Sequence, residues 1–247
     1  RRLETLPELA ESPYDGVSPS LDAVSSRMRF FHSLRQDSTP LVLAHLFGLL
    51  KPFPAPDDLR DSFLDLEVGQ MLGRDLLLRT LLDFGYAKEE LIASAGEYAW
   101  RGGVVDFFSP WNKSPHRVEF SADTIVSIRE FDPSTQRSSG RVSRIVIPSL
   151  REFPGGARFL EEWGERAQAN GCPPARLGGE ENGSSFKAGI SPDFAFLALL
   201  QKDRFVPFTH YLKEAVFINA DPDEVEKEWT EGREDLARRY EDLRKGD

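Results

Sequence analysis

The chain has 247 residues, of which 40% are hydrophobic, and a formal net charge of −10. This length exceeds that of one typical domain, so we expect two domains or one large domain with an insertion. The hydrophobic share excludes a wholly disordered chain, and the apolar runs are too short to span a membrane. The acidic balance disfavours nonspecific binding to nucleic-acid phosphates, so a nucleic-acid role would need a local basic face.

The cysteine and histidine content limits the cofactors that the chain can hold. Cys172 is the single cysteine, which excludes an internal disulfide and a multi-thiolate zinc site. The four histidines are scattered, without the spacing of metal ligands. We therefore predict no metal and no other cofactor. The first residues lack the apolar stretch of a secretory signal, so we expect a cytoplasmic location and a chain that begins inside a longer polypeptide.

Residues 1–85 show the alternation of strands and helices that is typical of an α/β layer. Ser18 and Pro19 have the pattern of a helix N-cap followed by proline at the first helical position, before apolar residues at helical spacing. The other elements predicted in this part are a strand at 41–44, a helical turn at 45–50, a strand at 64–68 and a helix at 74–84.

Residues 86–150 have a different character. They carry eight basic and eight acidic side chains, whereas both flanking segments are net acidic. Short segments with strand patterning follow one another, at 97–101, 104–108, 116–120, 124–131 and 141–147. Each is closed by glycine, proline or aspartate turn residues. We predict an antiparallel sheet backed by the preceding helix, as a β-rich α+β domain inserted into the α/β layer.

The C-terminal part, residues 151–247, is expected to return to α/β character. A helix is predicted at 159–168, a loop at 171–189 and a strand at 215–218. Asp221 has the features of an acidic N-cap, followed by proline at the first helical position and Glu224 at the third. A charged connector helix is expected to run from there to about residue 244.

The sequence contains no residue set suited to enzymatic chemistry. A P-loop needs a glycine turn followed by lysine and serine or threonine, and no glycine pair in this chain has that continuation. Cys172 is followed by two prolines and has no nearby histidine to activate it. Carboxylate pairs such as Asp221 and Asp223 suit helix caps and turns. We predict that the chain is not an enzyme.

A pair of arginines in the charge-neutral segment points to a function. With a period of two, Arg101 projects from one face of its strand, while Tyr98 and Trp100 project from the other. If the strands of Arg101 and Arg117 pair as a hairpin, both guanidinium groups share an exposed face suited to carboxylates of another protein. The alternative is that both arginines only solvate the sheet and pair with acidic neighbours, namely Glu97, Asp106 or Glu119.

Several ordered motifs resemble those of the bacterial transcription-repair coupling factor family, Mfd, and more distantly those of UvrB. They are GEYAWRGGVVDFFSP at 96–110, RVEF at 117–120, FDPSTQR at 131–137 and PSLREFP at 148–154. An earlier motif, SPYDGVSP at 12–19, is similar to the coupling factors and not to UvrB. The resemblance is strongest between residues 85 and 154, and its several motifs in order make it more specific than one short pattern.

The resemblance implies an incomplete, degenerate nucleotide-binding-type α/β layer with an inserted β-rich α+β domain. Residues 1–63 are then the partial first half of a UvrB-like layer, 64–148 the UvrA-interaction domain, and 149–247 the returning segment with its connector helix. The family's module lacks working ATPase motifs, in agreement with the missing phosphate cradle. The full-length family protein is an ATP-dependent DNA translocase, and its motor lies elsewhere.

By the same resemblance, the chain is expected to recruit UvrA and so to couple nucleotide excision repair to stalled RNA polymerase. The family's contact arginines fall on Arg101 and Arg117. Phe120 and Lys88 are expected as further UvrA contacts, with Lys88 the weaker because UvrB relatives have arginine there. RNA polymerase and DNA are partners of other parts of the full-length protein, and another of its domains is a candidate to mask the UvrA-binding face.

A rival interpretation is a UvrB-like, DNA-handling fragment that contributes to a helicase or ATPase site. It would need phosphate-binding motifs and a basic track, whereas this sequence has an acidic total and no phosphate cradle. ATP turnover, or DNA binding that weakens with salt, would favour this alternative.

Overall fold

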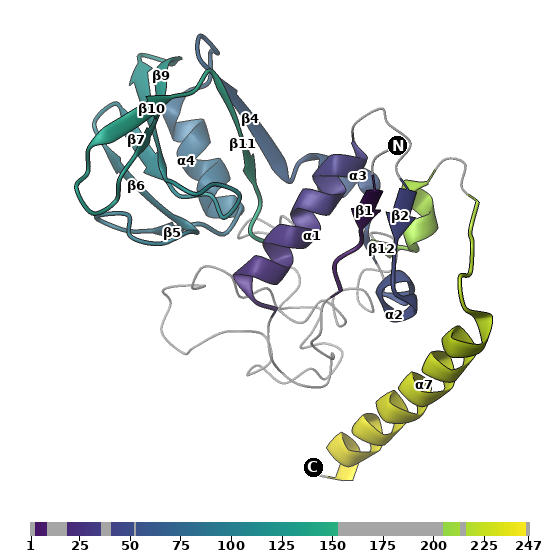
Figure 1. Cartoon of the computed structure of the whole chain (residues 1–247). Helices are drawn as coiled ribbons and strands as arrows, with labels where there is room; N and C mark the ends of the chain where they lie inside the picture. The colour runs from purple at the N-terminus through teal and green to yellow at the C-terminus, as the bar shows by residue number, and fades with distance from the viewer. Residues whose placement is uncertain are drawn as a thin grey trace.

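The structure, a computed structural model, describes residues 3–8, 19–35, 41–51, 53–152, 205–212 and 216–245. It is a mixed α/β arrangement with three two-stranded sheets and one six-stranded sheet (Figure 1). Within these residues, no helix combines the length and the apolar character needed to cross a membrane. The predicted helix at 159–168 and the loop at 171–189, with Cys172, lie outside the described residues.

The first part of the chain forms a parallel strand pair connected by a helix. β1 (Leu3–Thr5) lies beside β2 (Leu41–Leu43) in parallel register, and α1 (Leu21–Leu34) comes between them in the chain. Such a strand, helix and strand unit is the building block of an α/β layer; the sequence predicts the helix and the strand at 41–44, whereas the strand at 3–5 was missed. Three short elements follow, α2 (Leu46–Leu50), β3 (Phe53–Pro54) and α3 (Pro56–Arg60).

The core of this first part is built largely from aromatic rings. Phe31 of α1 meets Phe53 of β3 edge to face, with the ring centroids 5.8 Å apart. Phe53 also lies 5.3 Å from Phe208, in the short 3-10 helix η3 (Phe208–Tyr211). β12 (Phe205–Val206) pairs antiparallel with β3. The chain beyond residue 204 therefore returns to the first part and completes its core.

Two predicted details of the flanking parts are wrong. The N-cap of α1 is Ser20, whose Oγ accepts a hydrogen bond from the Ala23 backbone N–H at 3.2 Å, so Pro19 precedes the helix. Ser18 lies outside the described residues. The segment predicted as a strand at 215–218 forms no strand over the described residues 216–218, which are exposed. An apolar run becomes a strand only where it finds a pairing partner.

A ribbon of two antiparallel strands leads into and out of the second part of the chain. β4 (Phe63–Glu67) pairs along its whole length with β11 (Arg144–Pro148), and Phe63 lies opposite Pro148. Both ends of the intervening segment therefore lie side by side, as expected of an inserted domain (Figure 1). The predicted strand at 141–147 is wrong as one element. Its first residue belongs to β10 (Ser138–Arg141), and β11 lies in a different sheet.

The second part contains the six-stranded sheet, with the strand order β10-β9-β8-β7-β6-β5. β5 (Ala87–Lys88) runs parallel to β6 (Glu97–Arg101), and the remaining neighbours are antiparallel. The other strands are β7 (Val104–Phe107), β8 (His116–Ser121) and β9 (Thr124–Phe131). α4 (Arg74–Asp83) packs on one face, where Leu77 and Leu81 are fully buried. The predicted antiparallel sheet backed by the preceding helix is thus confirmed.

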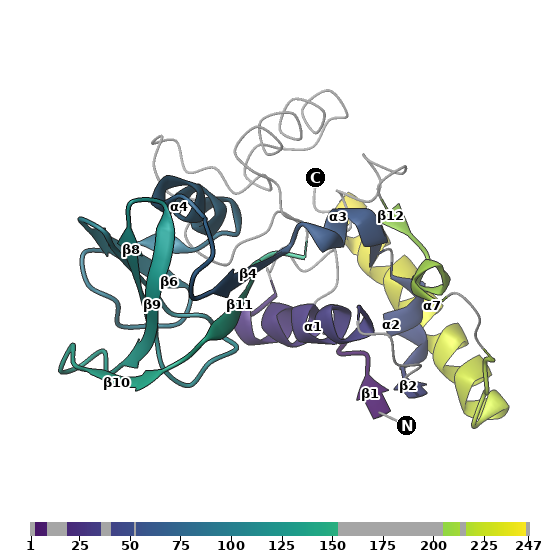
Figure 2. The same cartoon turned by 90° about the horizontal axis from the view of Figure 1, so that it is seen from above.

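A buried arginine connects the two parts. Arg27 of α1 forms an ion pair with Glu152, which follows β11, and both side chains are almost fully buried. Arg27 also donates a hydrogen bond of 2.9 Å to the Pro7 carbonyl, and its guanidinium lies 5.2 Å from the centre of the Phe53 ring. Figure 2 shows α1 between the six-stranded sheet and α2. The contact ties the end of the inserted segment to the core of the first part.

The chain ends in a long charged helix, α7 (Pro222–Lys245). Asp221 caps it, since its Oδ1 accepts a hydrogen bond of 3.2 Å from the Glu224 N–H, which confirms the predicted cap. α7 contacts α2 where Gly232 faces the Phe47 ring. A β-carbon at Gly232 would overlap that ring, so the missing side chain permits the close approach.

Candidate protein-binding face

The face of the six-stranded sheet away from α4 carries two neighbouring rows of side chains. Opposite residues of antiparallel strands project to the same side of a sheet, so the register defines each row. The first row, from β6 to β9, is Arg101, Val104, Glu119 and Ser127. The second, from β6 to β10, is Ala99, Asp106, Arg117, Arg129 and Arg141. We call these nine residues the open face.

Arg101 and Arg117 therefore share one side of the sheet, as expected from the sequence, although their strands do not form a hairpin. β7 lies between β6 and β8, so the two arginines are two strands and one row apart. Neither side chain belongs to the core: Arg101 is exposed, and 21% of the Arg117 side chain is exposed. Both guanidinium groups are thus accessible from the same direction.

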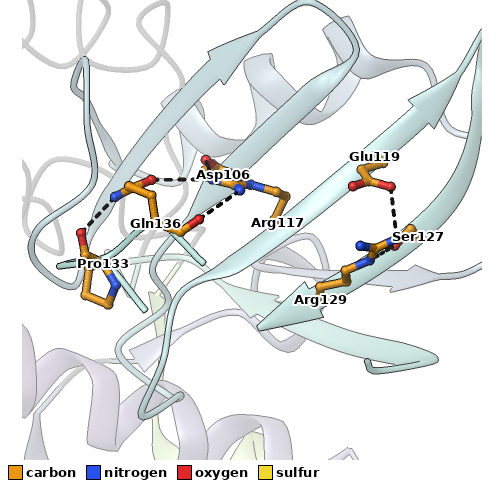
Figure 3. A network of polar contacts seen from close by, with 7 residues as sticks. All are labelled: Asp106, Arg117, Glu119, Ser127, Arg129, Pro133 and Gln136. Carbon is orange, nitrogen blue, oxygen red and sulfur yellow. Dashed lines mark hydrogen bonds and ion pairs between the residues drawn. The ribbon is translucent and has the colours of Figure 1, made fainter. Parts of the chain in front are cut away.

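Arg117 is held in a fixed orientation. Its Nε and Nη2 each donate a hydrogen bond of 2.8 Å, to Oδ1 and Oδ2 of Asp106 (Figure 3). Nη1 donates to the Gln136 carbonyl at 3.4 Å, and the guanidinium lies 4.6 Å from the centre of the Phe131 ring. The hydrogen bonds to Asp106 raise the pKa of Arg117 above its already high ordinary value. The group is charged at every physiological pH and needs little reorganisation to bind an anion.

Arg101 is held less firmly. It ends β6 and is followed by Gly102, whose φ of +57° suits the tight turn into β7. Its Nη2 donates one hydrogen bond of 3.2 Å to the Glu90 carbonyl, in the loop after β5. A guanidinium has five N–H donors, so most of those of Arg101 face solvent.

Both arginines line one hollow of about 300 Å³ on the open face. Its wall is the loop at 90–92, and Ile92 of this loop packs into a small buried cluster with Ala99 and Phe131. The other lining residues are Glu90, Leu91, Trp100, Val104, Asp106, Glu119 and Gln136. The lining thus combines apolar side chains with two arginines and three carboxylates, and the two guanidinium groups are the positions in it where an acidic side chain of another protein can bind.

A second polar contact extends the open face toward β9. Arg129 donates a hydrogen bond of 2.9 Å from Nε to the Ser127 hydroxyl, and its Nη2 lies 3.6 Å from Glu119 (Figure 3). Sequence reasoning missed Arg129, although the motif IREF places it one strand from Arg117. The signal that finds it is the register of β8 with β9, which the short turn at Ala122 fixes.

The structure does not bring Lys88 and Phe120, the other two predicted contacts, onto the open face. Lys88 lies opposite Tyr98 on β5, and its Nζ is 5.7 Å from the centre of the Trp100 ring. Phe120 packs against the core under α4 and lines a second hollow of about 290 Å³ that includes Arg74. Both residues lie at the margin of the sheet, on the α4 side.

Trp100 is partly exposed, although it projects to the side of the sheet that α4 covers. It projects to the α4 side, as predicted, but it lies beyond the end of the core and 41% of it is exposed. The Arg74 guanidinium lies 5.2 Å and the Lys88 Nζ 5.7 Å from the ring centre, so two cations contact the indole. Alternation with a period of two predicts the side of the sheet on which a residue lies. It does not predict where the hydrophobic core on that side ends.

The comparisons with known proteins agree with this architecture. The UvrB interaction domain family model matches residues 64–153, the segment that contains the ribbon and the six-stranded sheet. Residues 64–153 resemble a UvrB interaction domain throughout. The start of the match falls within β4 and its end lies just beyond β11, so the family boundaries coincide with the ribbon.

The chain is also similar to transcription-repair-coupling factors, which confirms the resemblance seen in the motifs. It is 34% identical over 152 residues to the Myxococcus xanthus protein, 61% of this chain and 13% of that protein. The Haemophilus influenzae protein is 32% identical over 167 residues, 64% of this chain and 15% of the relative. The Escherichia coli protein is 32% identical over 149 residues, which are 60% of this chain and 13% of that protein. The similar region is thus a small fraction of these relatives.

Proposed function

We propose that residues 64–148 dock this protein on UvrA, within a coupling factor that recruits nucleotide excision repair. Residues 1–63 and 149–247 would form the degenerate UvrB-like layer that carries the domain. The match to the UvrB interaction domain and the similarity to coupling factors support this role. The observation that carries it is that Arg101 and Arg117 line the same hollow on a sheet face that α4 does not cover.

The proposed mechanism is binding rather than catalysis. Arg117, oriented by Asp106, would donate charge-assisted hydrogen bonds to a carboxylate of UvrA. Arg101 would bind the same carboxylate or a neighbouring one. The wall around Ile92 would exclude water and strengthen these bonds. The described residues contain no group of three or more side chains that could hold a metal ion. RNA polymerase and DNA would be bound by other parts of the full-length protein.

Lys88 and Phe120 remain predicted contacts of lesser weight. Because they lie on the α4 side, a partner seated on the open face would reach them only by extending around β5 or around the turn after β8. Their replacement is therefore expected to weaken UvrA binding less than replacement of either arginine.

The test is a titration of purified UvrA with the whole chain carrying Arg101→Ala and Arg117→Ala together. We expect at least a hundredfold loss of affinity, with an unchanged circular dichroism spectrum. Arg79→Ala is the matched control, because Arg79 is exposed on α4 and its loss removes one positive charge elsewhere. Wild-type affinity in the folded double variant would refute the proposal. ATP turnover by the purified chain would instead favour the UvrB-like enzyme alternative.

A further inference from the structure

Three arginines lie directly opposite one another on three adjacent strands of the open face. The register places Arg117 of β8 opposite Arg129 of β9, and Arg129 opposite Arg141 of β10. Like charges in opposite positions destabilise a sheet. Folding alone would favour alternating charges or neutral residues here, so the arrangement calls for an additional explanation.

Only two of these arginines are compensated within the sheet. Asp106 accepts two hydrogen bonds of 2.8 Å from Arg117, and Glu119 lies 3.6 Å from Arg129. Arg141 is exposed, and no described carboxylate lies within 4 Å of its guanidinium. The charged residues of the two rows are four arginines and two carboxylates. The excess positive charge lies toward the β10 edge, away from the hollow.

We propose that Arg141, with Arg129 beside it, is a second binding position for carboxylates on the same partner protein. This inference rests on the proposed function, because it extends the Arg101 and Arg117 site to the edge of the sheet. Neighbouring strands are about 4.8 Å apart, so the backbones of Arg117 and Arg141 are separated by about 10 Å. The partner surface would therefore carry at least two acidic groups separated by roughly this distance.

The chemistry favours an acidic protein surface over a nucleic-acid backbone. Asp106 and Glu119 lie between the arginines of the open face, where they would repel closely spaced phosphates. Individual carboxylates can instead each meet one guanidinium and avoid the two acidic positions.

An edge strand can also carry a charge simply to prevent pairing with another sheet. β10 is the edge of this sheet, so Arg141 has this simpler explanation as well. The two explanations differ in what they predict. A residue that only prevents edge pairing affects self-association of the chain. A binding residue affects the affinity for UvrA and the dependence of that affinity on salt.

The experiment compares five forms of the whole chain: the wild type, Arg141→Glu, Arg141→Gln, Arg79→Glu and the Arg101→Ala, Arg117→Ala double variant. Each is titrated with purified UvrA at three salt concentrations and with a labelled duplex DNA. We expect Arg141→Glu to weaken UvrA binding at least tenfold at low salt and to lower its salt dependence. Arg79→Glu should stay within twofold of the wild type. Arg141→Gln, which keeps a polar side chain, should give a smaller loss of about threefold.

The outcomes separate this inference from the function on which it rests. If the double variant loses UvrA and Arg141→Glu binds like the wild type, the second position is overturned and the proposed function stands. If the double variant binds normally, the proposed function itself fails. If Arg141→Glu weakens binding to DNA and not to UvrA, the occupant is nucleic acid and the inference is overturned. Arg141→Gln decides the question if the charge reversal disturbs the fold.

Discussion

Asp106 lies directly opposite Arg117 on the neighbouring strand, and each of its carboxylate oxygens accepts a hydrogen bond of 2.8 Å from the guanidinium. The Asp106 and Arg117 side chains are 16% and 21% exposed, so the pair lies at the surface of the sheet without being buried in it. The carboxylate therefore orients the arginine, whose Nη1 and Nη2 also donate longer hydrogen bonds of 3.4 Å to Gln136.

Replacement of Asp106 by Asn should weaken UvrA binding about three- to tenfold, because Arg117 loses the bidentate contact that orients it. The free energy of unfolding should fall by about 1 kcal/mol, the ordinary contribution of such hydrogen bonds near a surface. Titration calorimetry and urea denaturation measure the two effects. Asp65→Asn is the control, since Asp65 accepts a hydrogen bond of 2.8 Å from Arg144 on the ribbon, away from the open face. Tighter binding by the Asp106 variant would show that this carboxylate competes with the partner.

Replacement of Trp100 by Ala should destabilise the domain by about 1–2 kcal/mol while leaving UvrA affinity within twofold of the wild type. The variant loses the two cation contacts from Arg74 and Lys88, which join α4 and β5 to β6. Although Trp100 is one of the residues that line the hollow, its ring contacts Arg74 and Lys88 on the α4 side, away from the two binding arginines. Trp100→Phe should recover part of the stability. A large loss of affinity in a folded Trp100 variant would place the partner on the opposite side of the sheet.

Breaking the buried ion pair between Arg27 and Glu152 should be more costly than removing both partners. Glu152→Leu should lower the free energy of unfolding by about 3 kcal/mol, because a buried guanidinium loses its counter-charge. The Arg27→Met, Glu152→Leu double variant should lose less than the sum of the two single replacements. Chemical denaturation of all four forms in a double-mutant cycle gives the coupling. Additive losses would contradict the idea that the pair acts as a unit.

Stability should fall as the pH decreases below about 6.5. Burial lowers the pKa of His116, which stacks on Phe107 at 5.9 Å, and burial with the neighbouring Arg35 lowers that of His32. The unfolded chain therefore binds more protons than the folded chain below pH 6.5, and the stability present at neutral pH is lost toward the lower folded-state pKa values. His116→Phe should reduce this loss between pH 7.5 and 5.5 in thermal denaturation.

A matched control for the pH experiment is His210→Gln, because His210 is exposed. It should leave the pH profile unchanged. If His116→Phe and the wild type lose stability in parallel, then His32 or buried acidic groups account for the dependence instead of His116.

The strands of the six-stranded sheet were largely predictable, because alternating side chains and turn residues in the sequence mark where each strand begins and ends. Alternating residues, and turns such as Gly102 with its positive φ, place β6 to β9 within one or two residues of their observed limits. The shared face of Arg101 and Arg117 follows from the same period of two. Sequence alone did not show which strand lies between them, because that depends on pairing.

Other features depend on contacts between distant segments. Residues 141–147 have one continuous strand pattern, yet the Val142 N–H bonds to Ile128 and the Ser143 carbonyl bonds to Val68, so the chain changes sheets there. The predicted strand at 215–218 has the right composition, but the described residues 216–218 have no strand partner among the described residues. The side of the sheet on which Lys88 lies likewise follows from the parallel pairing of β5 with β6.

The ribbon of β4 and β11 brings the two chain ends of the inserted segment together, and Trp111 of that segment adds a second contact, a hydrogen bond of 3.1 Å from its Nε1 to the Ser25 carbonyl of α1. Because Phe63 and Pro148 face each other, the first and last residues of the 64–148 segment are close neighbours, so a short linker could replace everything between them without stretching the remaining chain. Deleting or grafting the segment would therefore leave the chain ends in place, but it would break the contact in which the Trp111 ring lies 5.3 Å from the His32 ring of α1.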